Sequence, residues 1–148
     1  MKEKRRILIV DDNRSLVLAA ERVLQKNGFD VLTAFNGLDG LEKARTEKPD
    51  LIVLDIVMPE MDGYEVCRRL KSNPDMARIP VIILSSKGET DESKAAPVIG
   101  LKEVYMAYDR GANNFLTKPV TASDLLDAVK KELSFCTLLS EAANTADK

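Results

Sequence analysis

The sequence predicts an α/β fold of the doubly wound type, in which helices cover both faces of a five-stranded parallel sheet. Short apolar runs alternate five times with segments of helical period along the 148 residues. The runs are apolar at nearly every position, which is typical of parallel strands buried on both faces. Polar residues able to carry chemistry directly follow these runs, at the edge where such folds bind ligands. The expected strand order is 2-1-3-4-5.

The first half of the chain holds three strand–helix units. Strands are expected at residues 6–10, 29–34 and 51–54. Helices are expected to begin at Asn13 or Ser15, at Asn36-Gly37 and at Asp62-Gly63. They should end at Asn27-Gly28, before Pro49 and at Asn73-Pro74. Helical spacing predicts that ten residues face inward: Leu16, Ala20, Val23, Leu24, Leu38, Leu41, Ala44, Val66, Cys67 and Leu70.

The second half holds two more strands, at residues 81–84 and 115–117. Between them the segment 87–114 is long, and Pro97 and Gly100 interrupt it. We expect helical pieces near 89–96 and 101–110. Thr121 and Asp124 form a capping box for a last helix. This helix should bury Leu125, Val129 and Leu133.

The chain length suits one domain, expected at residues 1–133, followed by a tail at 134–148. The tail is too apolar for a disordered end and could extend the last helix. Leu133, Cys136, Leu139 and Ala143 would then form an apolar stripe. Such a stripe could pair with a second copy or another domain, or fold back onto its own domain. The expected state is therefore a monomer or a weak dimer.

The composition excludes several classes of function. A net charge of −2 leaves no basic footprint for nucleic acid. No apolar stretch is long enough to span a membrane. The two cysteines lack the spacing of a metal site, which favours the reducing cytoplasm. Histidine is absent, so any chemistry must use carboxylates, hydroxyls and lysine.

Three aspartates are the main candidates for chemistry. Asp11 and Asp12 follow the first strand and Asp55 follows the third, and these strands should be neighbours. Three converging carboxylates repel one another unless a hard divalent cation binds them, and magnesium is the expected ion. Asp55 is the best nucleophile, because a carboxylate can attack phosphorus and form an aspartyl phosphate. The alternative is that Asp11 and Asp12 only cap the first helix.

Ser85 and Lys118 follow the fourth and fifth strands. The Ser85 hydroxyl could donate a hydrogen bond to a phosphoryl oxygen, and the Lys118 ammonium could neutralise its charge. Phosphoryl transfer needs mainly positioning and charge neutralisation. Taken singly, the serine would more often be a cap and the lysine a solvated side chain. Their placement at strand ends favours the functional interpretation.

Four segments carry a resemblance to a known family. They are Val10-Asp11-Asp12, the run 55–63 of the form D-x-x-M-P-x-M-D-G, Ser85-Ser86-Lys87, and Phe115-Leu116-Thr117-Lys118-Pro119. Over about residues 5–133 the chain resembles a response-regulator receiver domain of two-component signalling, close to the single-domain, CheY-like chemotaxis type. The resemblance implies a flavodoxin-like (βα)5 sandwich. It also implies a segment 87–114 about eleven residues longer than usual.

The resemblance assigns roles to the candidate residues. Asp55 would take a phosphoryl group from a sensor histidine kinase or a phosphotransfer protein. Asp11, Asp12, Asp55 and the backbone carbonyl of Val57 would bind Mg²⁺. Ser85 and Lys118 would contact the phosphoryl group, and Lys118-Pro119 would be a cis peptide. Phe115 would be a switch residue that turns inward with Ser85, although a plain core role for Phe115 remains open.

The implied protein is a signalling domain that catalyses only its own phosphorylation and dephosphorylation. It would act on a downstream output protein or domain. One alternative is a receiver-shaped interaction module that takes no phosphate, although no acidic residue or lysine of the pattern is missing. An aspartate-nucleophile phosphatase would want an aspartate at position 57, which is valine. A flavin carrier would want a Ser/Thr/Gly-rich loop where Asp11-Asp12-Asn13-Arg14 stands.

Overall fold

Five runs of aliphatic and β-branched residues form one parallel sheet in the computed structural model, which describes residues 4–86, 111–118 and 120–146. The strands are β1 (Arg6–Val10), β2 (Asp30–Ala34), β3 (Leu51–Asp55), β4 (Val81–Ser86) and β5 (Asn114–Lys118). Their order is β2-β1-β3-β4-β5, and every neighbouring pair is parallel. The predicted fold class and strand order are confirmed.

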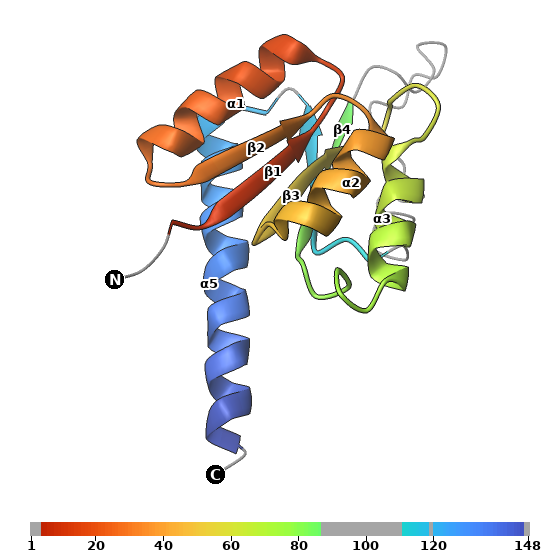
Figure 1. The fold of residues 1–148 in the computed structure, drawn as a ribbon. Coiled ribbons are helices and arrows are strands. Elements are labelled where there is room, and N and C mark those ends of the chain that lie inside the picture. The colour runs from red at the N-terminus through yellow and green to blue at the C-terminus, as the bar shows by residue number, and fades with distance from the viewer. Residues whose placement is uncertain (1–3, 87–110, 119, 147–148) are drawn as a thin grey trace, which may run out of the picture.

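Four helices flank the sheet within the described residues. They are α1 (Arg14–Lys26), α2 (Gly37–Glu47), α3 (Gly63–Ser72) and α5 (Ala122–Ala146). Helices α1 and α5 cover one face of the sheet, and α2 and α3 cover the other (Figure 1). The helical pieces expected at 89–96 and 101–110 lie outside the described residues, as do Lys87 and Pro119 with its expected cis peptide.

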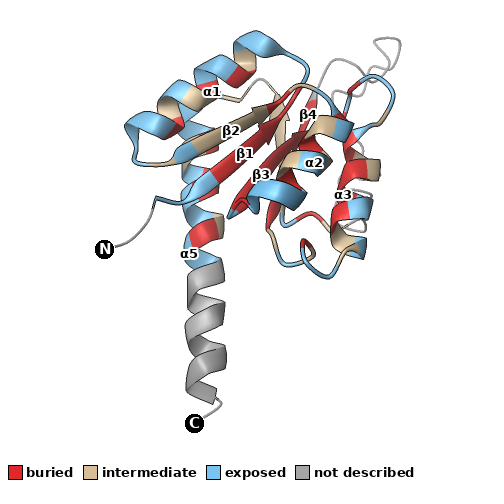
Figure 2. Cartoon of the chain, in the orientation of Figure 1, coloured by how far each residue is buried: buried red, intermediate tan, exposed pale blue. Residues whose placement is uncertain are grey.

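The core forms one apolar layer on each face of the sheet. Ile7 and Ile9 face α1 and α5, whereas Leu8 and Val10 face α2 and α3. Figure 2 shows the buried residues concentrated in the central strands and on the inner sides of the helices.

The sequence predicts that ten helical residues face inward, toward these layers. Val23 is half-buried, Leu38 is exposed, and the other eight belong to the two layers or pack against them: Leu16, Ala20, Leu24, Leu41, Ala44, Val66, Cys67 and Leu70.

Leu38 corrects the prediction for the second helix, because its side chain is 56% exposed. The buried face of α2 consists of Gly37, Gly40 and Ala44. A Cβ built on Gly40 would lie 2.8 Å from the Val10 side chain, so α2 lies unusually close to β1. This close approach selects the small residues as the inner face and turns Leu38 toward solvent.

Polar side chains fix the beginnings of three helices. Asn13 accepts a hydrogen bond from the Leu16 amide, which identifies Asn13 rather than Ser15 as the cap of α1. Asn36 and Thr121 accept in the same way from Asp39 and Asp124. Such caps satisfy backbone N–H groups that have no partner within the helix.

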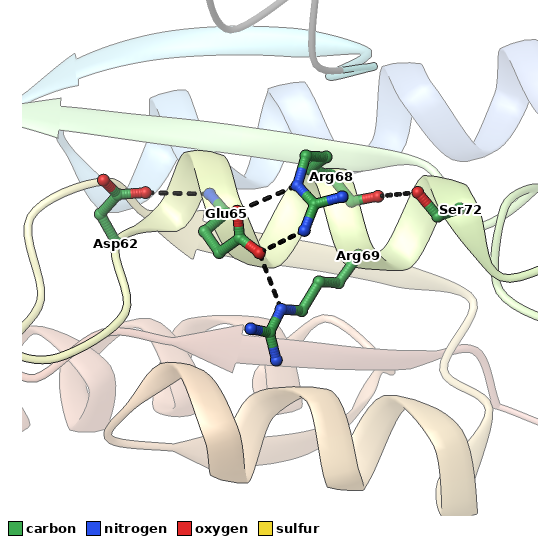
Figure 3. Close-up of polar contacts among 5 residues, drawn as sticks. All are labelled: Asp62, Glu65, Arg68, Arg69 and Ser72. Atoms are coloured by element: carbon green, nitrogen blue, oxygen red, sulfur yellow. Dashed lines mark hydrogen bonds and ion pairs between the residues drawn. The ribbon is translucent and has the colours of Figure 1, made fainter.

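Helix α3 begins at the end of the loop that follows β3. Asp62 caps it by accepting from the Glu65 amide at 2.9 Å, and Glu65 then pairs with Arg68 and Arg69 one turn later (Figure 3). The hydrogen bonds from Arg68 and Arg69 lower the pKa of Glu65 to about 2. Cap and ion pairs together fix the start of α3 next to the end of β3.

The second strand begins at Asp30, one residue later than expected. The Phe29 amide donates to the Leu24 carbonyl and so belongs to the end of α1. At the other end of the chain, α5 continues through residues 134–146 as one helix. Figure 1 shows this second half of α5 extending past the sheet.

Candidate functional site

The sheet register brings Asp11 and Asp55 side by side. Val10 of β1 is paired with Leu54 of β3, and the residue after each of them is an aspartate. Asp11 is fully buried and Asp55 is 2% exposed. Because parallel strands end at the same edge, both carboxylates lie at the carboxyl edge of the sheet, as predicted.

Lys118 reaches both carboxylates from β5. Its Nζ donates a hydrogen bond to Asp11 Oδ2 at 2.9 Å and lies 3.3 Å from Asp55 Oδ1. Burial opposes the charge of the ammonium, but the bonds and charges of Asp11 and Asp55 outweigh it and raise the pKa of Lys118. The lysine therefore stays cationic and neutralises part of the acidic charge.

Asp12 completes a group of three carboxylates. One oxygen from each of Asp11, Asp12 and Asp55 lies within 4.8 Å of the others. Asp12 is exposed, whereas the other two are buried, so the group opens to solvent on the side of Asp12. The Asn13 amide donates to Asp11 Oδ1 at 2.9 Å and holds that carboxylate in place.

The ionised form of Asp55 is disfavoured in this arrangement. Burial, followed by the charge of Asp11, raises its pKa from 3.8 to about 7, even though Lys118 acts in the opposite direction. Among the described residues, Asp55 Oδ1 is a buried side-chain oxygen that accepts no hydrogen bond. An added positive charge at this place would relieve both conditions.

A divalent cation fits these residues. Hard cations take carboxylate oxygens as ligands, and magnesium binds through one or two carboxylates while keeping several waters. The three carboxylates supply suitable ligands, among them Asp55 Oδ1, which accepts no hydrogen bond. The donor set contains no sulfur or imidazole, which argues against zinc or copper.

Ser85 lies next to Asp55 at the same edge. Asp55 is paired with Leu84 in the register of β3 and β4, so Ser85 follows directly beyond it. Ser85 is 7% exposed and is paired with Thr117 of β5. Phe115 is half-buried on β5 and packs against the apolar layer of α2 and α3. Val57 is exposed in the loop after β3.

Two residues of the site were not singled out from the sequence as parts of its geometry. A Cβ on Gly63 would lie 2.2 Å from the Asp55 carbonyl oxygen, so only glycine allows the loop to close on β3. The Gly63 amide donates to the Ile56 carbonyl at 2.8 Å. The Asp62-Gly63 pair was visible as a helix start, but the backbone approach was not. Asn13 was recognised only as a cap.

These features can be compared with those of known proteins. A family model described as the response regulator receiver domain matches residues 7–130. The chain belongs to this family, whose members are signalling domains of two-component systems.

Relatives in the family include both short and long proteins. Protein PilH of Pseudomonas aeruginosa is 40% identical over 130 residues, which cover 87% of this chain and 98% of PilH. Protein PilG of the same organism is 37% identical, covering 84% of each chain. The alkaline phosphatase synthesis transcriptional regulatory protein PhoP of Bacillus subtilis is 39% identical, covering 85% of this chain. The match spans only 47% of PhoP, about half its length.

Solved structures agree with the fold. A CheY-like receiver domain from Methanospirillum hungatei has a TM-score of 0.77 at 26% identity, covering 91% of this chain and 98% of that one. Chemotaxis protein CheY4 of Vibrio cholerae has a TM-score of 0.76 at 25% identity, covering 87% and 98%. In the described part of the chain, no helix is both long and apolar enough to cross a membrane.

Proposed function

We propose that this chain is a phosphoacceptor that takes a phosphoryl group onto Asp55 in a magnesium-dependent reaction. One observation carries the proposal. The carboxylates of Asp11, Asp12 and Asp55 converge within 4.8 Å, and Lys118 Nζ lies 3.3 Å from Asp55 Oδ1, which accepts no hydrogen bond. This arrangement combines a nucleophile with groups that can neutralise phosphoryl charge.

The metal ligands would be Asp11, Asp12, Asp55 and the backbone carbonyl of Val57. When bound, Mg²⁺ supplies positive charge that keeps the Asp55 carboxylate ionised and offsets the charge of the phosphoryl oxygens. The raised pKa of Asp55, about 7, supports a need for this charge, because only the ionised carboxylate is nucleophilic.

The transfer itself exchanges one bond to phosphorus for another. A carboxylate oxygen of Asp55 forms the new P–O bond while the P–N bond of a phosphohistidine breaks. The departing imidazole takes up a proton and leaves neutral. These 148 residues contain no histidine, so the phosphohistidine would be supplied from outside them, by a sensor histidine kinase or a phosphotransfer protein. Hydrolysis by water later returns Asp55 to a carboxylate and releases inorganic phosphate.

Lys118 and Ser85 would hold the phosphoryl group. Lys118 now divides its contacts between Asp11 and Asp55, so a phosphoryl group on Asp55 offers the ammonium a nearby anion. Ser85 follows the residue paired with Asp55 and can donate its hydroxyl. Movement of Ser85 toward the phosphoryl group would leave room for Phe115 to turn inward, which changes the surface of β5 seen by an output protein or domain.

We also propose partners and a cellular compartment for this function. The family relation supports a kinase or phosphotransfer protein upstream and an output protein or domain downstream. The two cysteines lack the spacing of a metal site and the described Cys67 is buried, which fits the reducing cytoplasm. We propose that the protein acts there.

The test is a phosphorylation assay on the intact chain. The protein is incubated with acetyl phosphate and Mg²⁺, and its mass is measured. We expect an adduct of one phosphoryl group, no adduct after chelation of the metal, and none in Asp55→Asn. Asp30→Asn is the matched control, because Asp30 begins β2 at the opposite end of the strands and should leave the adduct unchanged.

A second measurement separates the roles of the acidic residues. Beryllofluoride, which mimics the phosphoryl group, should bind only with Mg²⁺, and Asp12→Asn should raise the Mg²⁺ concentration needed for this binding more than Asp30→Asn does. If the unmodified chain forms no adduct and binds no beryllofluoride, the protein is instead a receiver-shaped interaction module.

A further inference from the structure

The second half of α5 has an apolar side of its own. At 100° per residue, six polar residues of this half fall within an arc of about 140°. They are Ser134, Thr137, Ser140, Glu141, Asn144 and Thr145. Seven apolar residues fill the remaining arc: Phe135, Cys136, Leu138, Leu139, Ala142, Ala143 and Ala146. No polar position falls among the apolar ones, so this half is amphipathic.

This apolar arc continues the face that packs on the sheet only in part. In the first half of α5, the buried positions are Leu125, Ala128, Val129 and Leu133. The centre of the second arc is turned from the centre of these positions by about 70°. Positions 136, 139, 143 and 146 fall within the arc of these buried positions, whereas 135, 138 and 142 lie beyond it on the side of the exposed Lys131, and Phe135 is 56% exposed. The apolar side of the second half is therefore turned toward Lys131.

The position of the second half leaves room for a covering partner. Figure 1 shows it extending beyond the sheet and the other helices. A helix of about 13 residues without tertiary contacts is marginal in water, and most helical stability comes from packing of the apolar face. The helix is continuous to Ala146.

We propose that the second halves of two α5 helices pair antiparallel and form a dimer of this chain. Residue size supports this orientation, because the large residues precede residue 140 and the small ones follow it. An antiparallel pair centred between Ser140 and Glu141 sets position 135 opposite 146. It sets positions 138 and 139 opposite 142 and 143. Large residues then oppose small ones along the contact, which is the pattern of a well-packed interface.

Charge supports the same orientation. The last turn of α5 contains no basic residue, so the negative end of its dipole is not compensated within the helix. In the antiparallel pair, Lys131 of one chain lies about one turn beyond the end of the other helix. Each chain then supplies a cation to the other. The only charged residue among positions 134–146, Glu141, lies on the polar arc and gives no reason to expect a charged partner.

The dimer should be weak. The paired region is about 20 Å long, and a standard interface buries roughly 800 Å² on each partner. Association should therefore depend on concentration. Sedimentation equilibrium from about 1 μM to about 1 mM, without phosphodonor, covers the expected range. A monomer throughout that range would overturn the proposal, whatever the phosphorylation assay shows.

Two matched variants test the apolar arc. Leu138→Glu with Leu139→Glu places two charges within the contact and should raise the dimer Kd at least about tenfold. Thr137→Glu with Ser140→Glu adds the same charge to the polar arc and should change the Kd less than about twofold. Equal effects of the two pairs would overturn the proposal. Thermal unfolding of each variant shows whether the domain itself is intact.

Cross-linking tests the orientation. A chain with Cys136→Ala and Ala143→Cys is mixed with the unmodified chain under mild oxidation. Antiparallel pairing sets position 136 of one chain near position 143 of the other, so a disulfide should link the two different chains. Parallel pairing would link like with like, and a predominance of such homotypic dimers would overturn the antiparallel arrangement. Cys67 is fully buried and should not react.

Discussion

The interiors of β1 and β3 contrast with the ends of the same strands. Ile7 to Val10 and Leu51 to Leu54 are apolar and at most 1% exposed. One residue further, Asp11 and Asp55 are buried almost as deeply but carry carboxylates. The interior stabilises the fold by removing apolar surface from water. At the strand ends, the buried carboxylates repel one another, and a bound cation can relieve this repulsion. The residues that stabilise the core and the residues proposed to carry the chemistry are thus adjacent in the sequence.

The largest effect should come from the interior. Leu54→Ala should lower the free energy of unfolding by about 2–5 kcal/mol, because a fully buried leucine leaves a cavity. Urea denaturation measures the loss. Leu18→Ala, at a residue that is 49% exposed, is the control and should change stability by less than about 0.5 kcal/mol. Similar losses at both sites would contradict the assigned core.

At the end of β3, replacing Asp55 should have the opposite effect on stability. The pKa of Asp55 is raised from 3.8 to about 7 in the folded chain. Between these pH values the folded state holds a proton that the unfolded state has lost, so stability falls as pH rises from about 4 to about 7. The loss should be on the order of 4 kcal/mol without metal.

Asp55→Asn should remove this pH dependence and leave the metal-free protein more stable than the unmodified chain at pH 8. Urea denaturation at pH 5 and pH 8 measures both effects, with Asp30→Asn as the control. Saturating Mg²⁺ should restore stability to the unmodified chain but not to Asp55→Asn. An unmodified chain whose stability does not fall over this range would show that the Asp55 carboxylate is not strained.

The loop that joins the two regions should give a smaller effect. Gly63→Ala places a Cβ against the Asp55 carbonyl oxygen and should cost about 1–3 kcal/mol. It should also slow formation of the phosphoryl adduct, because the end of β3 must shift. Gly40→Ala is the comparison, since its added methyl meets the Val10 side chain instead of backbone. If the adduct forms equally fast in both variants, the conformation of this loop does not affect phosphorylation of Asp55.

The smallest effect should come from the cap of α3. Asp62→Ala removes the acceptor for the Glu65 amide and should cost about 1 kcal/mol. Asn36→Ala removes the equivalent cap of α2 and should cost about the same, while leaving the adduct unaffected. Thermal unfolding of the two variants compares them. A much larger loss at Asp62 would indicate a further role for its carboxylate in the loop.

Local patterns in the sequence were sufficient for much of the fold. The apolar runs predicted the strands, and side-chain caps such as Asn13 and Asp62 predicted the helix starts. The placement of Asp55 and Lys118 directly after strands predicted that they share an edge. Leu38 shows the limit of such patterns, because its spacing is helical but the inner face of α2 is set by Gly40 against Val10.

The sequence by itself determined which segments are strands and helices and which polar residues follow the strands, because both depend on neighbours a few positions apart. Only the tertiary structure decided that Lys118 contacts Asp11 across 107 residues and that one Asp55 oxygen remains without a hydrogen bond. It also decided that α5 extends beyond the sheet. Contacts of this kind depend on the packing of distant elements, which no local periodicity encodes.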